Sequence, residues 1–231
     1  MNTKKLLFIL VCWGMFCNAQ NVFELSDVSK TYHMIVNAER CNGKICEGKA
    51  IIDLYDKSTM KKYQTLSSEN FYLELNENRK PSVDSLKNSI IFDDFNFDGF
   101  EDVAVRDRSS DHGNLLFDVY LNNNSETKFA LHQELTDLVT ANSGMFTIDS
   151  ERKLIVSHLK NGCCWNLTSE YQYIPERGLL KVLEFEEDTR NSKEVKTIKR
   201  EFIDYKWFAK TTIYPRKLYF KAEKNENTER N

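Results

Sequence analysis

The chain has 231 residues, of which 41% are hydrophobic and 29% charged, and its formal net charge is −3. This length suits one sizeable domain or two small ones, and the mild acidity argues against nucleic acid or an anionic membrane surface as a partner. After the first 20 residues, no apolar run reaches the roughly 20 residues that a spanning helix needs. We therefore expect no transmembrane segment in the mature chain.

The first 19 residues have the pattern of a signal peptide. Lys4 and Lys5 supply the positive start, residues 6–16 are apolar, and residues 17–19 place small side chains where signal peptidase cleaves. The apolar run is too short to cross a bilayer as a helix. Cleavage after Ala19 leaves 212 residues with a charge of −5, because two lysines and no acidic residue are removed. We expect an exported protein, either periplasmic or secreted.

Two alternatives stay open for this segment. A lipoprotein would carry its lipid on Cys12 or Cys17, although the preceding Val11 and Phe16 are larger than the small residue wanted there. The segment could instead be an uncleaved anchor or a buried N-terminal strand.

Apolar alternation with a period of two dominates the rest of the chain and indicates β-strands separated by short turns. The strands are predicted at residues 31–38, 50–55, 71–75, 90–92, 102–105, 116–121, 129–132, 145–148, 153–158, 168–174, 179–186, 195–205 and 211–220. Short helices are predicted only at residues 82–88 and 133–139. The pattern favours an antiparallel all-β fold, either propeller-like or built from twisted sheets, whose core the 12% of aromatic residues would fill.

The expected domain organisation is simple. Residues 20–221 form one β-rich domain, and residues 76–82 are a candidate soft boundary behind an N-terminal β-meander. The polar residues 222–231 are expected to be a disordered tail.

Four cysteines remain after the predicted cleavage, and an even number in an exported chain suggests disulfides. Cys41 and Cys46 flank an Asn-Gly hairpin signal, which makes a bridge between them easy. Cys163 and Cys164 are adjacent, so they pair with each other or elsewhere. Four cysteines allow three pairings, and the sequence does not choose among them. A metal held by thiols is a further alternative, but no CxxC spacing supports it.

An acidic loop, residues 94–102, has the pattern D-x-N-x-D-G-x-x-D and predicts a Ca²⁺ site. Calcium takes about six to eight oxygen ligands, and this loop offers them from Asp94, Asn96, Asp98, the backbone carbonyl of Phe100, and Asp102. Gly99 permits the sharp turn that such a loop requires.

The loop is not an EF-hand, since its twelfth position is Val105 and its flanks look like strands. We expect Phe95 and Phe97 to face the core and clamp the loop. The alternative interpretation is a solvated acidic turn, because Asp, Asn and Gly all favour turns. We expect the metal to be structural rather than catalytic.

No recognisable catalytic motif is present. His33, His112, His132 and His158 are scattered, and the chain lacks a GxSxG elbow, a P-loop and a GxGxxG motif.

A family resemblance rests on residues 90–124, which contain DFNFDGFEDVAV followed by GN and DVYLNN. This stretch resembles the FG-GAP-like calcium repeats of propeller blades. The combined pattern resembles a bacterial exported family that neutralises peptidoglycan-degrading effectors of type IV secretion systems. That family is similar to periplasmic lysozyme inhibitors, and the resemblance covers the middle half of the chain.

The resemblance implies a propeller-like β fold with one calcium loop, then a strand, an SG-containing loop and an aromatic-rich strand. The corresponding segments here are residues 152–157, 161–165 and 171–173. In the lysozyme inhibitors an SGxxY loop enters the active-site cleft of the target. Here Asn161 stands for the Ser, Gly162 matches, and Trp165 stands for the Tyr, so these three residues are the candidate partner-binding residues. The alternative is that Trp165 packs against the neighbouring cysteines as core.

The leading functional hypothesis is therefore a non-enzymatic, calcium-stabilised binding protein, expected to inhibit or neutralise a cell-wall hydrolase. One alternative is an adhesion or scaffold module of the FG-GAP type, although a single loop argues against a repeat array. Another is a hydrolase whose site is assembled from distant loops, including His112 and His158.

Overall fold

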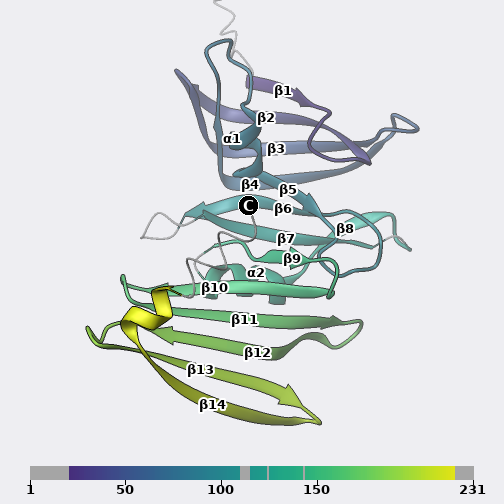
Figure 1. The fold of residues 1–231 in the computed structure, drawn as a ribbon. Helices are drawn as coiled ribbons and strands as arrows, with labels where there is room; N and C mark the ends of the chain where they lie inside the picture. Colours follow the sequence, from purple (N-terminus) through teal and green to yellow (C-terminus); the bar gives the residue numbers. More distant parts are fainter. Residues whose placement is uncertain (1–20, 110–114, 124, 143, 222–231) are drawn as a thin grey trace, which may run out of the picture.

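The computed structural model describes residues 21–221, apart from residues 110–114, 124 and 143. In this part of the chain, strands form three antiparallel sheets, and the sheets follow one another in chain order from the purple end to the yellow end (Figure 1). The predicted all-β fold of twisted sheets is confirmed. The signal peptide and the tail predicted at residues 222–231 lie outside the described residues.

The first sheet is a meander in which each strand pairs with the next along the chain. It contains β1 (Asn21–Leu25), β2 (Tyr32–Asn42), β3 (Ile45–Asp56) and β4 (Lys62–Glu74). The turn between β2 and β3 contains Gly43 at φ +62°, a conformation that glycine adopts without strain. Cys41 and Cys46 pair across this hairpin and form a disulfide, which is one of the pairings that the sequence left open.

The second sheet is central and has both faces covered. It contains β5 (Ile90–Asp93), β6 (Asp102–Ser109), β7 (Leu115–Asn123) and β8 (Lys128–Leu131). Val103 and Val105 on β6 point into a core shared with the first sheet, whereas Ala104 points into a second core. Because both faces are buried, the run Val-Ala-Val shows no alternation of polar and apolar residues.

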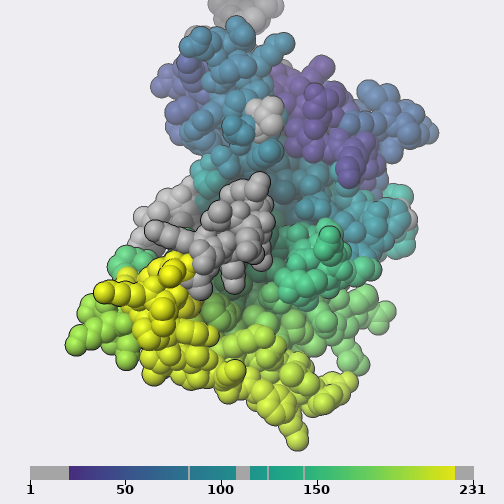
Figure 2. Space-filling view, viewed as in Figure 1, coloured from purple at the N-terminus to yellow at the C-terminus, as the bar shows by residue number. Residues whose placement is uncertain are grey.

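The third sheet is the largest, with the order β14-β13-β12-β11-β10-β9. Its strands are β9 (Thr147–Asp149), β10 (Leu154–Asn161), β11 (Trp165–Ile174), β12 (Gly178–Asp188), β13 (Glu194–Ile203) and β14 (Lys206–Pro215). The second core joins the second sheet to the β10 side of this sheet through Ile155, Phe146 and Tyr171. Strands β13 and β14 extend away from that core, and the space-filling view shows them at the end of the molecule opposite the purple first sheet (Figure 2).

Two short helices lie where the sequence predicted them. Helix α1 (Val83–Lys87) precedes β5, and α2 (Gln133–Ala141) buries Leu135, Leu138 and Val139 in or beside the second core. The first core includes residues on both sides of residues 76–82, such as Leu75 and Ile90.

The strand predicted at residues 211–220 is wrong in its second half. Strand β14 ends at Pro215, and residues 216–221 are helical. Proline has no backbone N–H with which to continue a β-ladder. The Arg216 side chain donates hydrogen bonds to the carbonyls of Thr189 and Asn191, at 2.6 and 3.1 Å, and holds the helical segment beside the sheet. Strand β1 was not predicted. Its burial alternates in the structure, but its sequence, Asn-Val-Phe-Glu-Leu, does not alternate polar with apolar residues.

Candidate functional site

The acidic loop joins β5 to β6 at the centre of the molecule. Asp93 and Asp102 pair with each other at the ends of these strands, so the loop is a short connection between two adjacent antiparallel strands. Phe97 at φ +62° and Gly99 at φ +90° supply its left-handed bends. Phe95 is buried with its ring against Phe146, at 5.5 Å between centroids. Phe97 packs partly against the same core, so both aromatic residues clamp the loop as predicted.

Three polar side chains of the loop turn toward its own backbone. The Asp94 carboxylate accepts the N–H groups of Asp98 and Gly99, at 3.0 and 2.9 Å. Asn96 Oδ1 accepts the Asp98 N–H at 3.1 Å, and Asn96 Nδ2 donates to Asp98 Oδ2 at 2.9 Å. Asp98 Oδ1 in turn accepts the Phe100 N–H at 2.9 Å. These contacts gather the oxygens of Asp94, Asn96 and Asp98 within one small turn.

Asp102 differs from these residues because its carboxylate is fully buried. Its two oxygens accept the backbone N–H groups of Phe95 and Asn122, both at 2.8 Å. Burial raises the pKa of Asp102 to about 7, and the nearby charges of Asp98 and Asp94 add to that increase against the effect of the two hydrogen bonds. A buried carboxylate that is repelled by two others is an arrangement that a cation would stabilise.

The donor set fits a hard divalent cation. Carboxylate, amide and carbonyl oxygens are the ligands that Ca²⁺ prefers, and the loop offers no sulfur or nitrogen ligand. In the described part of the chain, no three acidic, histidine or cysteine side chains are gathered closely enough to hold a metal ion. Such an ion would thus depend also on Asn96 and on the Phe100 carbonyl. The calcium site stays a prediction.

Glu101 is a residue of the acidic loop whose long-range contacts the sequence analysis missed. Its carboxylate accepts Ser29 Oγ–H and the backbone N–H groups of Lys30 and Thr31, at 2.8–2.9 Å. Burial acts to raise the pKa of Glu101, but these hydrogen bonds outweigh it and hold the pKa below its ordinary value. Glu101 therefore ties the acidic loop to the first sheet. Its partners lie about 70 residues away in the sequence, so no local signal reveals the contact.

Asn122 is the second missed residue and joins three elements. Its side chain accepts a hydrogen bond from Tyr63 Oη at 2.9 Å and donates to Tyr32 Oη at 3.0 Å. It also donates to the Glu101 carbonyl at 3.3 Å. A cleft of about 610 Å³ lies beside this network, lined in part by Asp94, Glu101 and Asn122. The acidic loop therefore lies beside a surface recess, packs its aromatic residues into the second core and is hydrogen-bonded to the connection before β2.

The candidate partner residues form the turn between β10 and β11, here called the partner turn (residues 161–165). Asn161 pairs with Trp165 across the hairpin, and Gly162 at φ +66° makes the bend. Asn161, Gly162 and Cys163 are exposed, and Cys163 forms a disulfide with Cys164. Each of the four cysteines that follow the predicted signal peptide is therefore bonded to the cysteine nearest to it in the sequence.

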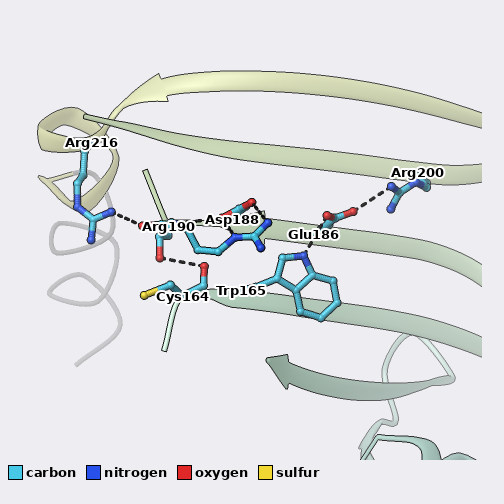
Figure 3. Close-up of polar contacts among 8 residues, drawn as sticks. Cys164, Trp165, Glu186, Asp188, Arg190, Arg200 and Arg216 are labelled. Carbon is cyan, nitrogen blue, oxygen red and sulfur yellow. Dashed lines mark hydrogen bonds and ion pairs between the residues drawn. The ribbon is translucent and has the colours of Figure 1, made fainter. Parts of the chain in front are cut away.

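Trp165 is half-buried at the base of the turn and lies on the sheet (Figure 3). Its Nε1–H donates to Glu186 Oε1 at 3.0 Å, and Arg200 donates to the other oxygen of Glu186 at 2.9 Å. The Trp165 and Arg200 hydrogen bonds hold the pKa of Glu186 below its ordinary value, against the smaller opposing effect of burial. The indole is therefore oriented by polar contacts and does not pack only as core.

The backbone of the partner turn is held as well. The Cys164 carbonyl accepts the Thr189 N–H at 2.7 Å, and the Thr189 carbonyl accepts a hydrogen bond from Arg216. Beside it, the hydrogen-bonded Arg190 lowers the pKa of Asp188 to about 2. The helical segment after β14 and the β12–β13 connection together fix the position of the turn.

The described histidines lie apart and each has a structural contact. His33 contacts Ser26, His158 contacts Thr168, and His132 caps α2. His112 lies outside the described residues.

Comparisons with known proteins support the fold. Neither a protein-family model nor a curated protein matches the sequence. Among solved structures, the chain is similar to a protein described as a Xanthomonas type IV secretion system related protein, with a TM-score of 0.65 and 21% sequence identity. The match covers 84% of this chain and 95% of that chain. At this identity the likeness shows a shared fold.

One further feature bears on cellular location. The Cys41–Cys46 disulfide suits an exported protein. Among the described residues, no helix has both the length and the apolar character required to cross a membrane.

Proposed function

We propose that this chain is an exported binding protein that inhibits a peptidoglycan-degrading enzyme through the partner turn. The observation that carries the proposal is the construction of this turn. Its tip exposes Asn161 and Gly162, while its base is held by the contact of Trp165 with Glu186 and by that of Cys164 with Thr189. A loop that is already ordered loses little conformational entropy on binding, which favours affinity.

Trp165 is the expected energetic anchor of the interface. Tryptophan is enriched among the few residues that dominate binding energies, and this indole is partly accessible beside an exposed turn. Glu186 and Arg200 lie next to it and add charged groups that could pair with a target. The turn is thus a small protruding surface suited to enter a cleft.

We further propose that the acidic loop binds Ca²⁺ through Asp94, Asn96, Asp98, the Phe100 carbonyl and Asp102. The ion would supply positive charge to the buried Asp102 and its neighbours. Since Glu101 in the same loop anchors the first sheet, the ion would also stabilise the junction between the first and second sheets. Its role is structural, and the binding surface lies on the third sheet.

The fold likeness supports this proposal indirectly. The similar solved protein is described as related to a type IV secretion system, and the resemblance in the sequence indicates a family that neutralises effectors of such systems. An all-β fold of this kind also fits a role in binding rather than catalysis.

Inhibition of cell-wall lysis tests the proposal. Purified protein is mixed with peptidoglycan hydrolases of several lysozyme classes, and the rate of cell-wall lysis is followed. We expect stoichiometric inhibition of at least one class. Trp165→Ala should weaken that inhibition at least tenfold, since truncation of a hot-spot residue costs about 2 kcal/mol or more. Trp165→Phe should restore part of it.

His158→Ala is the matched control, because His158 is exposed on β10 in the same hairpin and should leave inhibition unchanged. An unaltered rate of lysis in every hydrolase class would overturn the proposed function. Inhibition that is as strong with Trp165→Ala as with the original chain would instead remove the partner turn from the interface.

A further inference from the structure

Strand β14 forms a free edge of the third sheet. It pairs on one side with β13 along its whole length, from Lys206 opposite Ile203 to Pro215 opposite Glu194. In the described part of the chain, no strand pairs with its other side. Figure 1 shows β14 as the last strand at the lower border of the molecule. The outward backbone N–H and C=O groups of this edge are therefore available to another strand.

Several large apolar and aromatic side chains are exposed to solvent on this edge and in the turn before it. Trp207, Phe208, Ile213 and Tyr214 are each 40–58% exposed, and Tyr205 in the β13–β14 turn is 92% exposed. Because side chains alternate along a strand, Trp207 and Ile213 lie on one face and Phe208 and Tyr214 on the other. Apolar side chains thus flank the free backbone on both faces of the sheet.

This part of the molecule is also basic, in contrast to the chain as a whole. Residues 190–217 contain nine basic and three acidic side chains, whereas the complete chain has a net charge of −3. On β14 itself, Lys206 and Lys210 are the charged residues, and neither forms an ion pair with another described residue. The free edge therefore presents unpaired positive charge next to its apolar side chains.

We propose that the β14 edge is a docking site for an extended acidic segment of another protein, which adds to the third sheet as a further strand. Backbone hydrogen bonds would supply affinity, the flanking apolar residues would pack against alternate side chains, and the lysines would select acidic partners. The proposal does not depend on the partner turn, which lies between β10 and β11 on the same sheet.

The same observations disfavour two other occupants. A second copy of this chain that paired through its own β14 would bring two more lysines to the same edge and no acidic partner for them, because the strand contains no acidic residue. A membrane surface would require the apolar side chains to lie on one face, but they occupy both faces of the strand.

A synthetic ten-residue peptide that alternates glutamate with valine or threonine serves as the probe. Amide hydrogen exchange of the full chain reports which strand it protects, and Trp207 fluorescence reports affinity. We expect at least tenfold protection of the outward amides of β14 at saturating peptide. The double substitution Lys206→Glu and Lys210→Glu should weaken binding at least tenfold. A peptide with N-methyl groups on its backbone should bind at least tenfold more weakly.

The matched control is Lys61→Glu with Lys80→Glu, which makes the same change of charge in exposed connections flanking the first sheet. It should bind the peptide as the original chain does. The proposal is overturned if the peptide protects no amide of β14, or if a lysine–valine peptide binds equally well. It is also overturned if β14 mediates a dimer in sedimentation experiments, or if phosphatidylglycerol vesicles bind this edge and the peptide does not.

Discussion

His132 illustrates how one residue can carry a local and a long-range role. Its Nδ1 accepts the Leu135 N–H at 3.3 Å and caps the start of α2. Its ring lies beside Tyr173, whose hydroxyl is 3.5 Å from Nε2. Burial lowers the pKa of His132, and the opposing effect of Glu134 is smaller. The folded protein therefore favours the neutral ring, which leaves Nδ1 able to accept the capping hydrogen bond.

This lowered pKa predicts a loss of stability in mild acid. Above the ordinary pKa of 6.5, the ring is neutral in both states and contributes no pH dependence. Below it, the unfolded chain binds a proton before the folded chain does, so the free energy of unfolding falls as the pH falls. His132→Asn keeps a capping acceptor and removes the titration. Urea unfolding between pH 7.5 and 5 should show a flatter pH dependence for His132→Asn.

The difference between these two proteins isolates His132, because all other titrating groups are shared. Glu134 and Tyr173 are the polar groups that face the ring. Parallel pH profiles for the two proteins would contradict the assigned role.

At the scale of the element, the acidic loop is the connection whose chemistry is clearest. Its strand-like flanks belong to β5 and β6, and its aromatic residues enter the second core. The carboxylates of Asp94 and Asp98 stay outside that core, where they accept hydrogen bonds from peptide N–H groups and, at Asp98, from the Asn96 amide. The pairing of β5 with β6 and the packing of Phe95 and Phe97 thus hold the loop in a conformation that a cation could stabilise.

Calcium should raise the stability of the folded chain. With one site and free Ca²⁺ at 100 times its Kd, the free energy of unfolding should rise by about 2.7 kcal/mol. Asp98→Ala should abolish this gain, because it removes one of the proposed ligands. Asp93→Ala, which lies just outside the loop pattern, should keep it. Calorimetric melting in Ca²⁺, in Mg²⁺ and with a chelator measures the effect, and equal melting temperatures in all three would exclude the site.

At the scale of the whole molecule, the second sheet holds the other two together. The first core joins it to the first sheet, and the second core joins it to the third sheet through α2 and β10. Glu101 and Asn122 add a polar junction at the first interface, where Asn122 contacts Tyr32 and Tyr63. This junction lies beside the acidic loop, so the proposed metal binding would be coupled to the packing of the sheets through neighbouring residues.

Glu101→Ala should destabilise the fold by roughly 1–3 kcal/mol, because hydrogen bonds to a charged group are among the stronger ones. The partial exposure of Glu101 to solvent limits the effect to this range. The amides of Lys30 and Thr31 should lose their protection from hydrogen exchange. Glu77→Ala is the control, since its side chain is 90% exposed. Urea unfolding measures both variants, and equal stabilities would show that the Glu101 contacts contribute nothing.

Local chemistry made several features readable from the sequence alone. The Asn-Gly signal between Cys41 and Cys46 predicted a hairpin, because turn preferences depend on adjacent residues, and it made a disulfide across that hairpin one of the open pairings. The short helix at residues 133–139 and the strands that flank the acidic loop were visible for the same reason. Period-two alternation indicated antiparallel sheets wherever one face of a strand is exposed.

Other features were decided only by the tertiary structure. The contacts of Glu101 with residues 29–31 join segments about 70 residues apart, and no spacing in the sequence encodes such a pairing. The helical end at residues 216–221 depends on carbonyls of the β12–β13 connection, which Arg216 reaches only in the folded chain. The free edge of β14 likewise follows from the order of strands. Turn and strand preferences act between neighbours along the chain, whereas sheet order and burial depend on packing between distant segments.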